Sequence, residues 1–340
     1  MPDLLGFTSI AIVSIITLFI GIRWPKVSKI LFFALIIRVF ILLIGHYMIN
    51  LPDSTADSVS FEKTAWNIAQ EGFFNLPEYY KGPDSRFISW LIAIPYSLLG
   101  RSVLMAKSIS LFFGMGSVFL GWKLANKLWN SRVANKVGWL IALFPSLILY
   151  SALLMREAYI CFFLLVAIYG VINWVKTQSF KSIILALVGF IGASFFHGAS
   201  VLGAMTFIVF VGLYSMKESF LLLKNFEIKL SYLFLVILFF AVTIIYLSGE
   251  IYFPYIKSFD FVSNPDTLLR KTRVSVMGGA AYPEWTKATS AIELIYKVPA
   301  RSFYFLFSPF PWDIREAKHL IGFFDALLYI YLFILILKNI

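Results

Sequence analysis

The chain has 340 residues, of which 60% are hydrophobic and only 14% are charged. Soluble domains are usually about 45–50% apolar and about 25% charged, so this composition excludes a soluble globular protein and indicates a polytopic membrane protein. The formal net charge of +11 does not require a nucleic-acid partner, because basic residues of membrane proteins collect in cytoplasmic loops and near anionic lipid. With a single cysteine, Cys161, disulfide bonds cannot hold the fold.

Apolar runs in chain order predict nine spanning helices, since a transmembrane helix needs about 20 mostly apolar residues. These runs cover residues 7–23, 28–49, 102–122, 137–153, 157–174, 181–196, 198–215, 230–248 and 320–338. The expected fold is therefore all-α, with about nine transmembrane helices in one membrane domain that covers residues 1–340.

Two apolar runs have alternative interpretations. The run 181–215 is interpreted as two short spans that meet at Phe196-His197-Gly198, and one over-long helix is the alternative. The run 86–100 is short and contains Pro95, so we expect an interfacial or re-entrant segment there.

The distribution of charge predicts the orientation of the chain. Basic residues dominate the short loops 23–29, 123–136, 174–181 and 216–229. The positive-inside rule makes these loops cytoplasmic. The hydrophilic segments 50–101 and 249–319 are then the two extracytoplasmic loops, and the N-terminus lies outside.

The first external loop contains an amphipathic stretch that begins near Asp57. Apolar side chains recur at Phe61, Ala65 and Ala69, which predicts a helix lying in the interface plane of the membrane. Asp57 or Ser58 is expected to cap its N-terminus. The alternative to this structural role is that the carboxylate of Asp57 takes part in an enzymatic reaction.

Two further external turns carry candidate site residues. Glu157 follows Arg156 where two apolar runs meet, on the same predicted membrane face as Asp57. The two carboxylates could hold an acceptor hydroxyl, a proton or a metal ion, although Glu157 also suits a polar turn. His197 stands at the next external turn, where it is either structural or a hydrogen-bond donor to a phosphate oxygen.

The second external loop is rich in basic residues. They are Arg270, Lys271, Arg273, Lys287, Lys297 and Arg301. They form either a solvated face or a clamp for a lipid-linked phosphate, for which the arginine fork is well suited. Arg38 stands apart, near the middle of the second apolar run. A charge at this depth is often functional, but a backbone carbonyl partner or snorkelling is the alternative, and we expect no catalytic role.

Several motifs together resemble the GT-C membrane glycosyltransferases, which include the protein O-mannosyltransferases and the lipid A aminoarabinose transferase. Asp57-Ser58-x-x-Phe61-x-x-x-Ala65 resembles the Asp-x-x-x-Tyr/Phe-x-x-x-Ala motif of their first external loop. Pro95 to Arg101, Phe144-Pro145-Ser146 and Leu154 to Ala158 follow in the family's order, and His197-Gly198 occupies the place of a Lys-Gly or similar pair. The resemblance covers about residues 45–215, with a weaker similarity at 299–312. The chain departs from the family in having Glu157 rather than an aspartate, one extra span before the loop, and a shorter C-terminal part.

This resemblance implies an inverting enzyme that takes a sugar from a polyprenyl-phosphate carrier at the outer face of a bacterial inner membrane. Asp57 would be the general base on the acceptor, which is a glycan, a lipid or a protein. Glu157 would position the acceptor or Asp57, while His197, Arg301 and Arg270 or Arg273 would contact the donor phosphate. No cofactor is implied with certainty, and a divalent cation between Asp57 and Glu157 is left open.

Two other functions fit parts of the sequence. A polymerase or ligase of lipid-linked polysaccharide would depend on external arginines such as Arg270 and Arg301 rather than on Asp57. A transporter or flippase would show internal repeats and charges at mid-membrane, of which Arg38 alone fits. The sequence names neither the sugar nor the acceptor, nor the oligomeric state.

Overall fold

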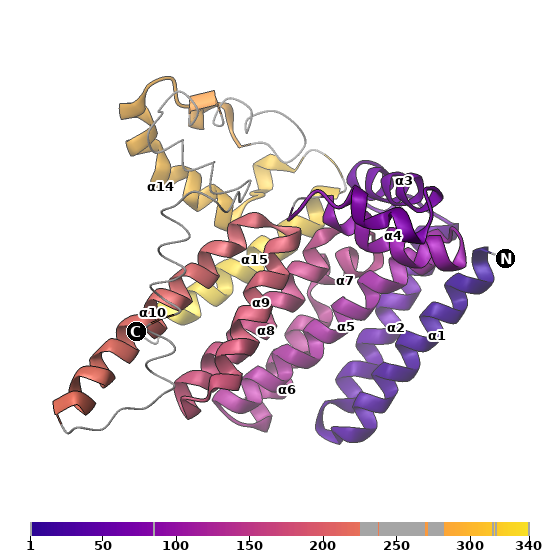
Figure 1. Cartoon of the computed structure of the whole chain (residues 1–340). Helices are drawn as coiled ribbons and strands as arrows, with labels where there is room; N and C mark the ends of the chain where they lie inside the picture. Colours follow the sequence, from indigo (N-terminus) through magenta and orange to yellow (C-terminus); the bar gives the residue numbers. More distant parts are fainter. Residues whose placement is uncertain are drawn as a thin grey trace. The chain divides into compact units, whose positions relative to one another are not determined.

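The computed structural model describes residues 2–83, 86–224, 237, 269–270, 282–314, 316 and 318–338. Contacts divide the chain into two compact units (Figure 1). The first unit comprises residues 1–143 and 147–254, and the second comprises residues 144–146 and 255–340. All regular elements in the described ranges are helices, so the predicted all-α class is confirmed.

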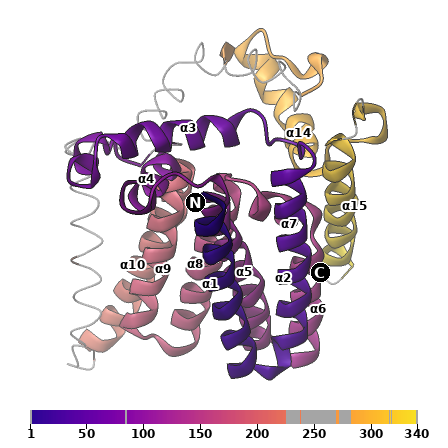
Figure 2. The ribbon, with the colours of Figure 1, turned by 90° about the vertical axis from the view of Figure 1, so that its right-hand side faces the viewer.

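The first unit contains most of the described helices. They are α1 (Pro2–Arg23), α2 (Pro25–Tyr47), α3 (Asp57–Gln70), η1 (Phe73–Tyr79), α4 (Phe87–Leu99), α5 (Val103–Leu128), α6 (Ser131–Leu143), α7 (Pro145–Ala152), α8 (Arg156–Thr177), α9 (Phe180–Phe196), η2 (Gly198–Ser200) and α10 (Val201–Lys224). The first two residues of α7 are grouped with the second unit. The long helices α1, α2, α5, α8 and α9 run side by side, and α3 lies across one end of them (Figure 2).

The second unit contains two long helices and two short ones among its described residues. They are η4 (Glu284–Thr286), α14 (Ala291–Phe307), η5 (Pro311–Asp313) and α15 (Lys318–Leu337).

Within the described residues, five helices are long and apolar enough to cross a membrane. They are Asp3–Arg23, Pro25–Tyr47, Val103–Leu128, Arg156–Thr177 and His319–Leu337, and the bent pair α6 and α7 makes a sixth if it is one span. The chain is therefore a polytopic membrane protein, but the predicted number of about nine spans is matched only in part. The run 181–215 forms two helices, as preferred, yet α9 is shorter than a full span, and the predicted span 230–248, apart from residue 237, lies outside the described residues.

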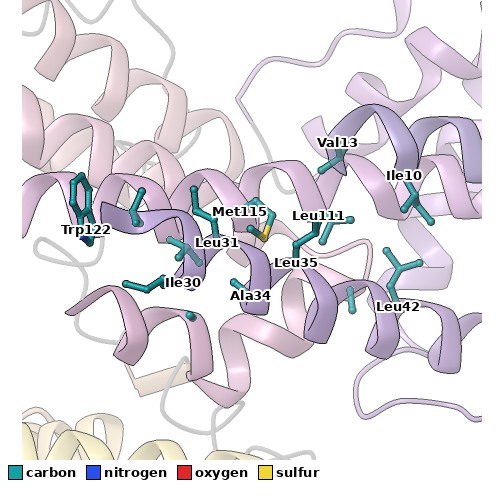
Figure 3. Packing of buried hydrophobic residues seen from close by; sticks show 14 of the residues in the cluster. Ile10, Val13, Ile30, Leu31, Ala34, Leu35, Leu42, Leu111, Met115 and Trp122 are labelled. Atoms are coloured by element: carbon teal, nitrogen blue, oxygen red, sulfur yellow. The ribbon is translucent and has the colours of Figure 1, made fainter. Parts of the chain in front are cut away.

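A hydrophobic core around α5 holds the first unit together. Leu111 and Met115 of α5 pack with Leu31 and Leu35 of α2 and with Val13 of α1 (Figure 3). Elsewhere the helices meet through small residues, which let backbones approach in a membrane protein. A Cβ at Gly189 of α9 would lie 2.3 Å from the backbone nitrogen of Ala167 in α8, and one at Gly170 would lie 2.4 Å from that of Ala186. These two helices therefore pack backbone against backbone.

The predicted span 137–153 is broken rather than straight. Helix α6 ends at Leu143, and α7 continues from Pro145 at an angle of 55°. The cause lies in the sequence, because proline has no N–H group to donate to the carbonyl four residues earlier and its ring clashes with that carbonyl. The break leaves the carbonyl of Ile141 without its helical donor.

The side chain of Arg38 supplies donors to this break. Its Nη1 atom donates to the carbonyl of Ala142 at 2.7 Å, and its Nη2 atom donates to that of Ile141 at 3.2 Å. Arg38 is fully buried, so it does not snorkel to the surface. The structure therefore confirms that backbone carbonyls are the partners of this intramembrane charge.

Candidate functional site

Helix α3 is held against α4 by the apolar face that the sequence predicts. Phe61, Ala65 and Ala69 are buried in a cluster with Ile88 and Ile92 of α4. We call this whole cluster the loop core; its other members are Leu76 of η1, Ala93 and Tyr96 of α4, Met105 and Ala106 of α5, Leu154 just before α8, Ala158 and Tyr159 of α8, and Phe196 of α9. Because its members come from five α-helices and η1, the loop core fixes the start of α3 against the ends of α8 and α9.

The predicted cap of α3 is wrong. The residue that precedes the helix is Ala56, with φ −97° and ψ −93°, and no side chain caps the helix there. Asp57 is instead the first helical residue, while Ser58 is buried. The charge of Asp57 still favours the helix, because negative groups are stabilising in the first turn.

The carboxylate of Asp57 is exposed and makes no hydrogen bond or ion pair with any described residue. One helical turn further on, the ring of Phe61 lies under the guanidinium of Arg156, with 5.6 Å from Cζ to the ring centroid. This contact joins the N-terminal turns of α3 and α8. It brings a cation to the part of α3 that carries the candidate base.

Glu157 lies in the first turn of α8, directly after Arg156. Its Oε2 atom is buried and has no hydrogen-bond partner among the described residues. Leaving a buried polar atom unpaired usually costs about 1–3 kcal/mol, and such an atom in a native fold calls for an explanation. A hydroxyl or cation supplied by a ligand would satisfy it.

His197 ends α9 and is exposed, in an extended conformation with φ −149° and ψ 101°. The preceding residue, Phe196, stacks on Tyr159 of α8 with ring centroids 4.8 Å apart. Because Tyr159 follows Glu157 by two residues, His197 and Glu157 flank the same part of the loop core. The structure thus brings Asp57, Glu157 and His197 to one end of the first unit.

The predicted phosphate ligands of the second external loop belong to the second unit. Arg301 Nη1 donates to the carbonyl of Thr286 at 3.2 Å, and its Cζ atom lies 4.3 Å from the ring centroid of Tyr282. Arg301 therefore holds η4 against α14. Arg270 is exposed, and Arg273 lies outside the described residues.

A buried network in the first external loop was missed by the sequence analysis. Glu62 is buried and forms a two-pronged ion pair with Arg101, in which Nε donates to Oε1 at 2.9 Å and Nη2 donates to Oε2 at 2.7 Å. The hydroxyl of Tyr96 also donates to Oε1, at 3.0 Å. Burial, reinforced by the neighbouring Glu62 carboxylate, raises the pKa of Tyr96, and the hydrogen bonds to Glu62 raise the pKa of Arg101. Glu62 lies four residues after the buried Ser58 and three before Ala65, and that spacing is the signal that would have placed it inward.

We expect Arg101→Met to destabilise the loop more than Glu62→Gln does. Losing Arg101 leaves a buried carboxylate with Tyr96 as its one remaining described partner, at a cost of about 3 kcal/mol. The Glu62→Gln variant leaves Arg101 without its ion pair, but the side chain of Arg101 is already 43% exposed. We therefore expect a loss of about 1 kcal/mol in the free energy of unfolding. Unfolding of both variants in detergent, monitored by tryptophan fluorescence, measures the difference. Equal losses would contradict the asymmetry.

Comparison of the chain with protein-family models, with curated proteins and with solved structures finds no match. No group of three or more His, Cys, Asp or Glu side chains gathers as a metal site within the part of the chain that the structure describes. The candidate site therefore stands on its own geometry, which consists of two carboxylates, an imidazole and an arginine around the rim of the loop core.

Proposed function

We propose that this protein is a membrane glycosyltransferase that moves a sugar from a polyprenyl-phosphate carrier to an acceptor on the extracytoplasmic face of a bacterial inner membrane. The observation that carries the proposal is the exposed, unpartnered carboxylate of Asp57 at the bundle end that also bears Glu157 and His197. Polar groups that a rigid helical frame holds at one end of a bundle are a common setting of an active site.

The proposed reaction is a displacement at the anomeric carbon of the sugar. Asp57 accepts the proton of the acceptor hydroxyl as that oxygen attacks, and a carboxylate within hydrogen-bond reach is suited to this role. The bond between the anomeric carbon and the phosphate oxygen breaks, and polyprenyl phosphate leaves with the electron pair. The attack from the opposite face inverts the configuration of the sugar.

The other residues have supporting roles in this proposal. Glu157 orients the acceptor through its unpartnered Oε2 atom, or joins Asp57 in holding a divalent cation. His197 donates to the leaving phosphate, whose developing charge is stabilised by donors that are already oriented. Arg270, Arg273 and Arg301 stay predictions for the same phosphate, and Arg301 has a structural bond to Thr286 as well.

Purified protein in proteoliposomes with a labelled polyprenyl-phosphate sugar tests the proposal. An extract of inner-membrane glycolipids serves as the acceptor pool. We expect label to move to the acceptor, with one polyprenyl phosphate released for each sugar transferred. Movement of the labelled lipid across the bilayer without any transfer product would support a transporter instead, and chain lengthening that survives Asp57→Asn but not Arg270→Met would support a polymerase.

A further inference from the structure

Helix α14 of the second unit exposes many apolar side chains, and several of them share one face. Ile292, Ile295, Phe303 and Leu306 are all more than half exposed. Their spacing of three to four residues, continued by Pro299, places them in a single stripe along the helix. A helix in a water-soluble protein would bury such an apolar stripe and expose its polar side chains.

The charged side chains of α14 contact the segment 282–290 of the same unit or one another. Lys297 Nζ donates to the carbonyl of Lys287 at 2.6 Å and to Glu293 at 3.1 Å. Arg301 binds Thr286 and lies over Tyr282. The charges of α14 are thus satisfied by its own chain, as they must be for a helix in lipid.

The C-terminal end of α14 lies beside the middle of α15, which is apolar enough to span a membrane. The rings of Phe307 and Phe333 are 5.4 Å apart, and Pro309 lies within 3.1 Å of the place that a Cβ at Gly322 would occupy. The segment of α15 between Gly322 and Phe333 is the central part of the helix and is about 16 Å long, at about 1.5 Å per residue. If α15 crosses the bilayer, the last turns of α14 lie at hydrocarbon depth.

The rise per residue of an α-helix gives the distance between Lys297 and the C-terminal end of α14. Lys297 precedes Phe307 by ten residues, or about 15 Å of helix. Half of a hydrocarbon core is also about 15 Å. Lys297 therefore reaches the level of the headgroups when Phe307 lies near the midplane.

We propose that the C-terminal half of α14 is inserted into one leaflet of the bilayer, with Phe303 and Leu306 in contact with lipid acyl chains and Lys297 at the headgroup phosphates. Ile295 and Ile292 precede Phe307 by about 18 and 22 Å of helix, so they lie at and beyond the level of the headgroups. The segment around α14, which the sequence assigns to an aqueous loop, is then a half-membrane element. The proposal is independent of the glycosyltransferase reaction.

Spin labels at single cysteines test this proposal directly. The chain has one cysteine, so Cys161→Ser gives a background into which Phe303→Cys, Leu306→Cys and Ile292→Cys are placed one at a time. Glu284→Cys, at an exposed position of η4, is the matched control. The labelled proteins are measured in phosphatidylethanolamine and phosphatidylglycerol vesicles, with oxygen and a water-soluble nickel chelate as the two collision partners.

We expect the labels at Phe303 and Leu306 to collide several-fold more with oxygen, relative to nickel, than the control label does, with Leu306 the deepest and Ile292 close to the control. Strong nickel collisions at Phe303 and Leu306 would mean that this face lies in water. Weak collisions with both partners would mean that protein covers it, with the apolar run 230–248 as the first candidate. Either of these two results would overturn the proposal.

Discussion

Replacing Asp57 by asparagine is expected to slow sugar transfer by about 10²–10⁴-fold, the usual contribution of a general base. The amide keeps the size of the side chain but cannot take the proton from the acceptor. Because the carboxylate of Asp57 is exposed and has no described partner, the fold should lose little stability. The rate of transfer in proteoliposomes, together with the unfolding midpoint, measures both effects.

The matched control for this variant is Asp53→Asn. Asp53 lies four residues earlier in the same loop, where it accepts a 3.3 Å hydrogen bond from the hydroxyl of Tyr150. Its φ of 61° is in the left-handed region, which asparagine tolerates well. Transfer at near wild-type rate is expected for this control. If Asp57→Asn transfers as fast as the control while folded, Asp57 is not the base.

Replacing Arg38 by methionine is expected to cost about 3 kcal/mol or more of folding free energy. The methionine fills much of the volume but leaves the carbonyls of Ile141 and Ala142 without the donors of Arg38. Each unsatisfied carbonyl in a hydrocarbon environment costs on the order of several kcal/mol. Arg23→Met, at the exposed end of α1, is the control and should change stability by less than about 1 kcal/mol.

A second substitution separates this cause from a simple packing defect. Pro145→Ala provides an N–H group that can donate to the carbonyl of Ile141 four residues earlier, as in a continuous helix. We therefore expect the double variant Arg38→Met with Pro145→Ala to be more stable than Arg38→Met alone. Unfolding in mixed detergent micelles compares the two. A double variant that is less stable than the single one would show that Arg38 does not act through these carbonyls.

The sequence was most informative where a local rule decides the structure. The sequence left a backbone carbonyl or snorkelling for Arg38, because no acid in another span obviously pairs with it, and the structure shows the carbonyls. The position of those carbonyls follows from Pro145, whose effect on the helix is also local. The loop 123–136 was predicted too long, since α5 continues to Leu128 and α6 already begins at Ser131.

The candidate site was predicted less completely, because its contacts are made between distant parts of the chain. The spacing of Phe61 and Ala65 predicts the buried face of α3, but not that Ala56 precedes the helix without a cap. The spacing of Glu62 to Ser58 and Ala65 indicates an inward position, but its partner Arg101 is 39 residues away and no local rule connects the two. The packing of Phe196 on Tyr159 likewise had no local signal.

The close approach of α8 and α9 has a mechanical consequence for a lipid-linked substrate. With Gly170 and Gly189 set against the opposing backbones, the two helices touch backbone to backbone, and the ring of Phe163 fills the space beside Gly192. Helices α8 and α9 should therefore move together as a rigid pair, and a prenyl chain cannot insert between them. If Asp57 acts on a lipid-linked sugar as proposed, that lipid reaches it along a flank of this helix pair.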